Sequence, residues 1–229
     1  MPLANAPDLE LFRTGDGSFT LRSEKHKEGY HSRHGAVQES THVFIHMGLM
    51  HVLDRIDDRP VDILEVGLGT GLNMLLTWIR CLEGKCRVNY TALEPYPLSR
   101  NVIEKLAYPD DLGWPGLGGS FLDLMTAPPV DRRSMEGGME FRSVHGSVQE
   151  LDLTEEFDLV YFDAFAPHVQ PEMWTSAIFD RIYGAMRRGA VLVTYCAKGD
   201  VRRTLEATGF TIERLPGPPG KREMLRATK

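Results

Sequence analysis

Residues 65–71 read Glu-Val-Gly-Leu-Gly-Thr-Gly and directly follow the run Val-Asp-Ile-Leu at residues 61–64. Glycine at every second position lets a backbone approach a ligand closely and permits a positive φ where a strand turns into a helix. A dinucleotide-binding pattern would need glycine at position 72, where this chain has Leu72. The Lys and Ser or Thr that end a phosphate-binding loop are replaced by Leu72, Asn73 and Met74. The stretch therefore predicts a strand, a glycine turn and a helix, and it disfavours a polyphosphate ligand.

Two acidic residues beside this stretch indicate the kind of ligand. Glu65 directly precedes the glycines, and Glu94 ends the next predicted strand, 23 positions after Gly71. A carboxylate at the end of the second strand of such a fold can accept hydrogen bonds from both hydroxyls of a ribose. The combination predicts a ligand that contains adenosine.

The rest of the chain alternates predicted strands and helices, which indicates a parallel sheet. Strands are expected at residues 61–66, 88–93, 139–144, 157–162 and 190–195, and helices at residues 71–82, 98–106, 171–187 and 201–208. Two last strands, at residues 210–215 and 223–227, are separated by Pro-Gly-Pro-Pro-Gly, which favours an antiparallel hairpin. An α/β fold with a seven-stranded, mostly parallel sheet that ends in an antiparallel hairpin resembles the Rossmann-like class I S-adenosylmethionine methyltransferases.

Before the alternating region, the sequence predicts a β-hairpin and then a helix. The Gly-Asp-Gly turn at residues 15–17 lies between two short strand-like segments, and residues 35–57 carry apolar side chains at helical spacing. We expect an N-terminal hairpin extension over residues 1–34 and one methyltransferase domain over residues 35–229. Residues 108–138 are rich in Gly, Pro and Asp and show no periodicity, so we expect a functional lid or a mobile loop there.

Composition and charge narrow the class of protein. The 229 residues are 42% hydrophobic and 25% charged, with no apolar run long enough to span a membrane. The beginning lacks the layout of a secretory signal, and the three cysteines form no Cys-x-x-Cys pair, which predicts a cytoplasmic protein without disulfides. The net charge of −6 disfavours a nucleic-acid partner, but basic residues cluster at 198–203 and 221–222. These clusters are either solvated faces or phosphate contacts.

The candidate site is expected at the carboxyl ends of the parallel strands, where such sheets bind ligands. Four segments meet there: residues 65–71, Glu94-Pro95, His145-Gly146-Ser147 and residues 163–167. Asp163 ends a buried strand at this edge, and it either caps a turn or takes part in chemistry. Phe165 offers an aromatic face beside this carboxylate, which suits an amine attached to a planar base.

Further motifs give a specific resemblance to a known family. Phe-Asp-Ala-Phe-Ala-Pro at residues 162–167, followed by Pro-Glu-Met-Trp-Thr at residues 171–175, resembles the signature of the MnmC/MnmD-type tRNA methyltransferases. Other stretches similar to this family occur in the same order along the chain: DGSFTL at 16–21, EGYHS at 28–32, HVFI at 42–45, EVGLGTGLN at 65–73, YPL at 96–98, TY at 194–195, GDVRR at 199–203 and GKREML at 220–225. The resemblance covers nearly the whole chain.

This resemblance implies an activity, a cofactor and roles for individual residues. Enzymes of this family transfer a methyl group from S-adenosyl-L-methionine to the primary amine of 5-aminomethyl-2-thiouridine at the wobble position of tRNA, giving 5-methylaminomethyl-2-thiouridine. Asp163 would accept a hydrogen bond from the amine and orient its lone pair, and Phe165 would stack on the thiouracil ring. The cofactor is expected at Glu65, Gly67, Gly69, Gly71, Asn73, Glu94, Pro95, Gly146 and Ser147. The substrate is expected at Tyr30 and His31, with Lys198, Arg202, Arg203, Lys221 and Arg222 on phosphates of the anticodon arm.

The chain departs from the family pattern at three points. Ala164 replaces the glycine of Asp-Gly-Phe, which makes the turn slightly less permissive. Ser147 replaces an aspartate, so the side chain that would recognise adenine carries a hydroxyl. The oxidase to which many family members are fused has no counterpart in this chain, so we expect a stand-alone methyltransferase that acts beside a separate oxidase.

Two other classes of function are alternatives. An aminopropyltransferase, or another small-amine N-alkyltransferase, has the same fold and also directs an amine to a sulfonium carbon beside an Asp, although a polyamine substrate calls for several carboxylates. A non-catalytic protein that keeps the fold is the second alternative, and the intact glycines, Glu94 and Asp163 disfavour it. No metal is expected, because His42 and His46 have no third ligand at a supporting spacing.

Overall fold

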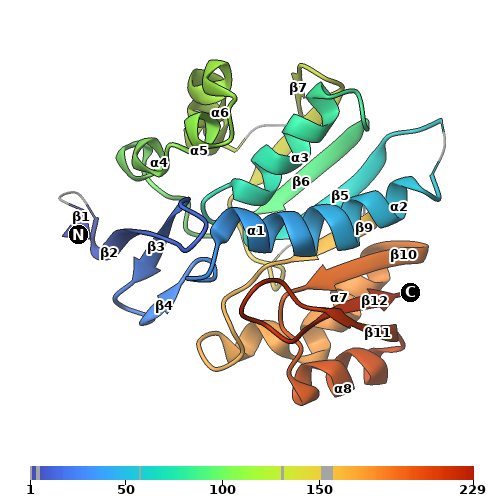
Figure 1. Cartoon of the computed structure of the whole chain (residues 1–229). Helices are drawn as coiled ribbons and strands as arrows, with labels where there is room; N and C mark the ends of the chain where they lie inside the picture. Colours follow the sequence, from blue (N-terminus) through green and yellow to red (C-terminus); the bar gives the residue numbers. More distant parts are fainter. Residues whose placement is uncertain (1, 4–5, 57, 130–131, 151–156) are drawn as a thin grey trace.

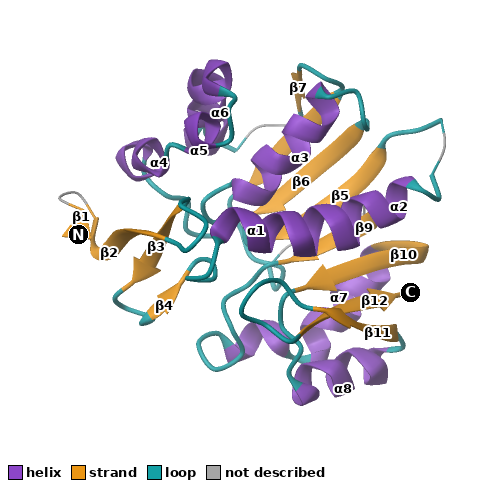
Figure 2. Ribbon diagram, in the orientation of Figure 1, coloured by secondary structure: helices purple, strands orange, loops and turns teal. Residues whose placement is uncertain are grey.

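The computed structural model describes residues 2–3, 6–56, 58–129, 132–150 and 157–229 of the chain. These residues form an eight-stranded sheet and a separate four-stranded sheet (Figure 1). Helices cover both faces of the larger sheet (Figure 2).

The central strands of the large sheet are parallel, as the alternation in the sequence predicts. They are β5 (Val61–Val66), β6 (Val88–Leu93), β8 (Met139–Val144), β9 (Phe157–Phe162) and β10 (Met186–Thr194). The spatial order is β11-β12-β10-β9-β5-β6-β8-β7. From β5 the chain builds outward through β6 and β8, and it then returns to add β9 and β10 on the other side of β5. The boundary between β5 and β9 is the topological switch point, where open sheets of this kind bind ligands.

The two ends of the large sheet are antiparallel. At one end β12 (Glu223–Thr228) pairs with both β10 and β11 (Thr211–Pro216), which confirms the predicted final hairpin. At the other end β7 (Arg133–Met135) pairs with β8. This eighth strand is absent from the sequence-based prediction of seven, because three residues are too few to show an alternating pattern.

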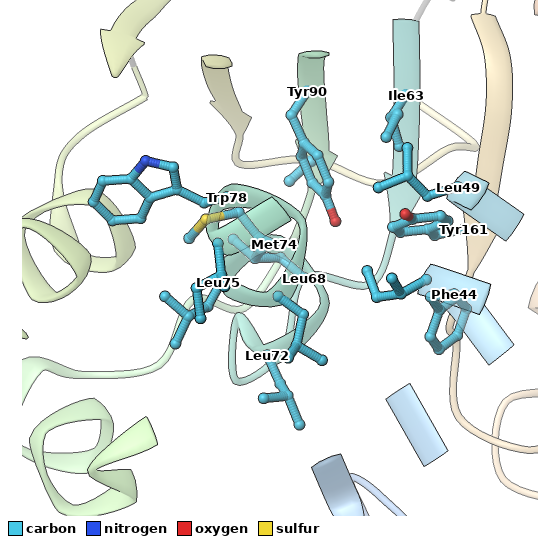
Figure 3. Close-up of a cluster of buried hydrophobic side chains, with 14 of the residues drawn as sticks. Phe44, Leu49, Ile63, Leu68, Leu72, Met74, Leu75, Trp78, Tyr90 and Tyr161 are labelled. Atoms are coloured by element: carbon cyan, nitrogen blue, oxygen red, sulfur yellow. The ribbon is translucent and has the colours of Figure 1, made fainter. Parts of the chain in front are cut away.

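Two hydrophobic cores lie on opposite faces of the large sheet because successive side chains of a strand point to opposite sides. Tyr161 of β9 faces the helical segment made of α1 (Ala36–Ser40), η1 (Thr41–Met50) and α2 (His51–Leu53), together with α3 (Leu72–Leu82). Its ring centroid is 5.2 Å from that of Phe44, and Figure 3 shows both rings near Leu49. Phe162 points the other way and packs on Trp174 and Phe179, the second of which belongs to α7 (Ser176–Ala185).

Residues 36–53 form a continuous helical segment with a π-helical stretch in its middle, which confirms the helix predicted there. Gly48 lets this helix approach the sheet closely, since a Cβ there would lie 3.0 Å from Val193 Cγ2. The remaining predicted helices are also present as α4 (Arg100–Leu106), η3 (Pro171–Trp174) leading into α7, and α8 (Gly199–Thr208).

The expectation of a lid or mobile loop at residues 108–138 is wrong for the part of this segment that the structure describes. It contains α5 (Tyr108–Asp111), η2 (Pro115–Leu117) and α6 (Gly118–Thr126) before β7 begins. The helix α6 buries four apolar side chains: Phe121, Leu122, Leu124 and Met125. Glycines and prolines at both ends of α6 dilute this short apolar stripe, which is why the sequence reads as irregular.

The small sheet consists of β1 (Pro2–Leu3), β2 (Ala6–Arg13), β3 (Phe19–Ser23) and β4 (Glu28–Gly29), in that spatial order. The antiparallel pairing of β2 with β3 confirms the hairpin predicted around the Gly-Asp-Gly turn. Asp16 Oδ1 accepts hydrogen bonds from Thr14 Oγ1 (2.7 Å) and Ser18 N (3.0 Å), and Asp16 Oδ2 accepts one from Gln38 N (2.9 Å). These contacts join the hairpin to α1, beside which the small sheet lies (Figure 1). The division into an extension and a domain at residues 34 and 35 stays a prediction.

Candidate functional site

The glycine turn after β5 packs closely on the end of β9. Gly67 has φ of +91°, and a Cβ on it would lie 2.7 Å from the carbonyl oxygen of Asp163. No other residue type satisfies both conditions without movement of the backbone. The carboxyl ends of β5 and β9 are thereby held against each other. Gly71 has a different role, because a Cβ there would collide with Met125 of α6 at 2.3 Å, and Gly71 does not line the cavity described below.

Glu94 fixes the shape of the glycine turn from the neighbouring strand end. Its Oε2 accepts a hydrogen bond from Gly69 N (2.9 Å), and its Oε1 accepts one from Tyr96 N (2.9 Å). Burial raises the pKa of Glu94 above its ordinary value, although these two backbone donors act in the opposite direction. The carboxylate therefore organises the loop in addition to facing the cavity.

One amide group joins the carboxylates of Glu65 and Asp163. The Asn73 amide nitrogen donates one hydrogen bond to Glu65 Oε1 (3.0 Å) and one to Asp163 Oδ2 (2.8 Å). Burial raises the pKa of Glu65, whose side chain is inaccessible to solvent, well above its ordinary value. Asn73 Oδ1 and Glu65 Oε2 are buried atoms without a hydrogen-bond partner among the described residues.

Asp163 leads into a loop whose backbone is held by side chains on three sides. The Tyr195 hydroxyl donates to Ala164 O (2.9 Å), Phe165 N donates to Gln170 Oε1 (3.1 Å), and Trp174 Nε1 donates to Phe165 O (2.8 Å). Burial and the nearby Glu39 carboxylate raise the pKa of Asp163 to about 7. A group that titrates near neutral pH can accept a proton during a reaction and release it afterwards.

The small sheet supplies an aromatic wall to the site. The Tyr30 ring meets the Phe165 ring edge-on, with centroids 5.1 Å apart, and the His26 ring lies 5.3 Å from the same ring. Burial, together with the Glu94 charge, raises the pKa of Tyr30 to about 12, so its hydroxyl stays neutral at physiological pH. Phe165 is therefore packed between two side chains that belong to the N-terminal segment.

His31 lies deeper than Tyr30 and is held as a neutral ring. Its Nδ1 is 2.8 Å from Thr20 Oγ1, and burial lowers the pKa of the imidazole to about 4. At neutral pH the ring therefore carries no charge, and it can offer a hydrogen bond but no electrostatic attraction to a phosphate.

Lys221 forms an ion pair inside the site. Its Nζ is 2.5 Å from Glu39 Oε1 and 3.8 Å from the centroid of the Tyr195 ring. The Glu39 side chain is almost fully buried and also accepts a hydrogen bond from Ser32 N (2.6 Å). Lys221 lines the cavity and is paired with a buried carboxylate, and its contact with substrate phosphates stays a prediction.

All these groups surround a single cavity of about 1160 Å³ at the carboxyl ends of the strands. Most of the site residues predicted from the sequence line it: Tyr30, His31, Gly67, Gly69, Asn73, Glu94, Pro95, Gly146, Ser147, Asp163, Phe165 and Lys221. The predicted residues outside its wall are Glu65, Gly71, Lys198, Arg202, Arg203 and Arg222. Glu65 is nevertheless tied to the site through Asn73.

The basic residues of α8 do not contribute to this cavity. Arg202 is paired with Glu206 one turn further along the helix, at 2.6 Å, and Arg203 is paired with Asp200. Lys198 and Arg222 are exposed. The cluster predicted from the run at 198–203 is thus largely neutralised within its own helix.

His26, Glu39 and Tyr195 are among the cavity residues that the sequence analysis does not assign to the site, although Tyr195 lies in one of the family-like motifs. Each reaches the site through contacts between distant segments, such as the ion pair between positions 39 and 221. A carboxylate within the otherwise apolar buried face of the predicted helix at 35–57 is the one clue that could have identified Glu39.

His42 and His46, the histidine pair considered for a metal, do not form such a site. His42 Nε2 lies 2.8 Å from the carbonyl oxygen of Pro216. No group of three or more His, Cys, Asp or Glu side chains in the described part of the chain is arranged to hold a metal ion. No helix among the described residues is long and apolar enough to cross a membrane.

Comparisons with known proteins agree with this geometry. Residues 131–229 match the model of a family described as S-adenosyl-L-methionine-dependent methyltransferase. The fold is similar to the crystal structure of MnmC2 from Aquifex aeolicus, with a TM-score of 0.73 and 24% identity over 96% of this chain and 70% of that chain. It is also similar to spermidine synthase from Thermotoga maritima, with a TM-score of 0.56 and 11% identity over 96% of this chain and 68% of that one. The chain therefore has the Rossmann-like class I fold, and its residues 131–229 are similar to S-adenosyl-L-methionine-dependent methyltransferases.

Within this class, the resemblance to MnmC-type proteins inferred from the motifs is confirmed. The chain is 33% identical to the tRNA 5-methylaminomethyl-2-thiouridine biosynthesis bifunctional protein MnmC of Nitrosospira multiformis, over 90% of this chain and 35% of that protein. It is 32% identical to the protein of the same name from Leptospira borgpetersenii, over 89% of this chain and 32% of that protein. The chain spans about a third of the length of these curated relatives.

Proposed function

We propose that this methyltransferase acts on the primary amine of 5-aminomethyl-2-thiouridine at the tRNA wobble position and produces 5-methylaminomethyl-2-thiouridine. One observation carries the proposal: Asp163 and the Phe165 ring lie on the wall of the same cavity as the glycine turn and Glu94. A cofactor loop, a carboxylate with a pKa of about 7 and an aromatic wall are the features that an amine attached to a base requires. The similarity to MnmC supports the choice of this particular amine.

The site fits S-adenosyl-L-methionine on two observations. Gly67 and Gly69 leave the cavity open where a side chain would fill it, since a Cβ on Gly69 would lie 3.2 Å from the Tyr30 ring. Asn73 lines the cavity, and its Oδ1 is a buried acceptor without a hydrogen-bond partner among the described residues, as expected of an atom that receives a hydrogen bond from a ligand. We assign the ribose to Glu94, the adenine to the segment at Gly146 and Ser147, and the methionine part to the turn near Asn73.

The chemistry requires little beyond orientation and an unprotonated amine. When bound, S-adenosyl-L-methionine would supply the methyl group of its sulfonium: an N–C bond to the amine would form as the S–C bond breaks, and S-adenosylhomocysteine would leave as a neutral thioether. Asp163 Oδ2 is engaged by Asn73, so Oδ1 is the atom that accepts the hydrogen bond from the amine. The nitrogen loses a proton after methyl transfer, and Asp163 or water takes it. A carboxylate with a pKa of about 7 holds that proton more readily than an exposed Asp.

The base is expected to enter from the side of the small sheet. Phe165 stacks on the thiouracil ring, while Tyr30 and His26 hold Phe165 in place. To reach this wall, the wobble nucleotide leaves the stack of the anticodon loop. Because the wall includes residues 26 and 30, removal of the N-terminal segment should abolish methyl transfer without removing the cofactor loop.

The alternative of an aminopropyltransferase rests on the fold that the chain has in common with spermidine synthase. Polyamine binding would require carboxylates that are free to meet ammonium groups. In this cavity Glu39 is already paired with Lys221, and Glu94 accepts two backbone hydrogen bonds. These pairings favour the tRNA substrate over a polyamine.

Methyl transfer to tRNA is the direct test. Purified protein with S-adenosyl-L-methionine is incubated with tRNA that carries 5-aminomethyl-2-thiouridine, and the nucleosides are measured by mass spectrometry. We expect 5-methylaminomethyl-2-thiouridine with the native protein and none with Asp163→Ala, whose affinity for the cofactor should stay within a few-fold. A protein that alkylates polyamines but not tRNA would disprove the proposal. Loss of cofactor affinity and of turnover to the same extent in Asp163→Ala would reassign Asp163 to cofactor binding.

The proposed substrate also defines the partners. The amine must be produced by an oxidase that removes a carboxymethyl group, and we assign this step to a separate protein or domain. A tRNA substrate places the activity in the cytoplasm.

A further inference from the structure

Three basic side chains line the cavity and have no ion-pair partner in the described part of the chain. Lys25 and Lys27 lie in the turn between β3 and β4, and Arg33 follows the segment that carries Tyr30. All three are exposed and line the cavity, and none forms an ion pair with another described residue. The nearby acids are in a different situation, since Glu28 faces His168 at 3.2 Å and Glu39 faces Lys221. Lys25, Lys27 and Arg33 therefore bring three positive charges to the side of the cavity that the N-terminal segment forms.

A large aromatic side chain is exposed on another part of the same wall. Tyr96 is 80% exposed, while every other large hydrophobic side chain of the described residues is exposed by 39% or less. Its backbone nitrogen donates to Glu94 Oε1, so the residue is anchored beside the expected cofactor position. A large aromatic ring that is exposed to solvent costs free energy. Such a ring can stack on an unpaired nucleic-acid base.

We propose that Lys25, Lys27, Arg33 and Tyr96 form the RNA-binding rim of the enzyme. When one nucleotide turns into the cavity, its flanking phosphates remain at the opening, where Lys25, Lys27 and Arg33 can neutralise them. Tyr96 stacks on a neighbouring unpaired base. This inference rests on the proposed function, and it replaces α8 with the turn between β3 and β4 as the main contact for phosphates.

Charge-matched double variants test the assignment of the phosphate contacts. The variant K25Q/K27Q removes two positive charges from the rim, and the control R202Q/R203Q removes two from α8. Affinity for tRNA that lacks the wobble methyl group is measured by fluorescence anisotropy at several salt concentrations, and affinity for S-adenosyl-L-methionine by calorimetry. For K25Q/K27Q we expect tRNA affinity to fall on the order of tenfold near 0.1 M salt. The slope of log affinity against log salt concentration should be smaller in magnitude by roughly 1 to 1.5, because each phosphate contact to single-stranded nucleic acid contributes about 0.7. The control should bind tRNA as the native protein does, and cofactor affinity should be unchanged in both.

Tyr96 is tested by a pair of substitutions. Y96A should weaken tRNA binding by about tenfold without changing the salt slope, because no charge is lost, and Y96F should retain native affinity. Native affinity and slope in K25Q/K27Q, or a larger loss in R202Q/R203Q, would overturn the assignment of the rim. Native affinity in Y96A would remove Tyr96 from it. If the native protein methylates tRNA and the variants bind tRNA with native affinity, the assignment of the rim is refuted and the proposed function stands. If the native protein binds the cofactor but not tRNA, the proposed function is refuted as well.

Discussion

Ionised Asp163 is expected to weaken the fold, so replacing it should stabilise the protein while it abolishes methyl transfer. An Asp carboxyl in the unfolded chain titrates near 3.8, and Asp163 in the folded chain titrates at about 7. The folded chain therefore binds this proton more tightly than the unfolded chain does. Stability is lost as the pH rises from 3.8, the unfolded pKa, through about 7, the folded pKa. At about 1.36 kcal/mol for each pH unit, ionisation of Asp163 at pH 8 costs up to about 4 kcal/mol.

Water in the open cavity reduces this cost, because Asp163 is only half-buried. We therefore expect Asp163→Asn to raise the free energy of unfolding by about 2 kcal/mol at pH 8 and by less than about 1 kcal/mol at pH 5. The amide oxygen of the new side chain can still accept the hydrogen bond from Asn73, so the geometry of the site is kept. Urea unfolding of both proteins at the two pH values measures the difference, and calorimetry with S-adenosyl-L-methionine reports on the cofactor site.

Asp158 provides a control with the opposite sign. Burial acts to raise the pKa of Asp158, but hydrogen bonds from Arg59 and Arg187 and the backbone of Asp62 hold it below its ordinary value. The ionised Asp158 carboxylate stabilises the fold at pH values above its pKa in the unfolded chain. This stabilisation is lost as the pH falls through its pKa in the folded chain. Asp158→Asn should thus destabilise the protein by about 2–3 kcal/mol at pH 8. An Asp163→Asn protein that is equally destabilised at pH 5 and pH 8 would refute the reasoning about Asp163.

Three further predictions concern packing and pairing in the site. Gly67→Ala should lower the free energy of unfolding by about 1–3 kcal/mol and weaken cofactor binding, because its Cβ collides with the Asp163 carbonyl; urea unfolding and calorimetry measure both effects. Lys221→Met should cost about 3 kcal/mol by leaving Glu39 buried and unpaired, and adding Glu39→Gln should restore much of that loss in the same unfolding assay. Tyr195→Phe removes the hydrogen bond to Ala164 and should lower kcat several-fold while cofactor affinity is unchanged; unchanged kcat would show that this bond does not position the loop.

The main features of the fold follow from local patterns in the sequence. Strands such as β5 and β9 are rich in apolar residues because both of their faces are covered by helices, and this composition is visible in the sequence. The glycines at 67, 69 and 71 mark the turn that such a strand needs before a helix. Since the carboxyl ends of parallel strands meet at one edge, Glu94 and Asp163 could be placed in one site without a structure.

Features that depend on contacts between distant segments were harder to predict. The helix α6 was missed because its apolar positions are few and are flanked by glycines and prolines. The role of Lys221 was assigned from its charge, whereas its ion pair depends on Glu39, 182 positions earlier in the chain. In α8, Arg202 pairs with Glu206 and Arg203 with Asp200 at helical spacing, a local pairing, and the phosphate contacts expected of this run stay a prediction.

The sequence by itself determined the class of fold, the cofactor turn and the strand ends that carry Glu94 and Asp163, because each depends on the residue pattern within a few positions of the chain. Only the tertiary structure decided which side chains complete the site. Tyr30 and His26 reach Phe165 because the small sheet packs beside the end of the large one, and no periodicity in either segment encodes that contact. The raised pKa of Asp163 is likewise a property of its surroundings, since burial and the Glu39 charge arise only when the chain is folded.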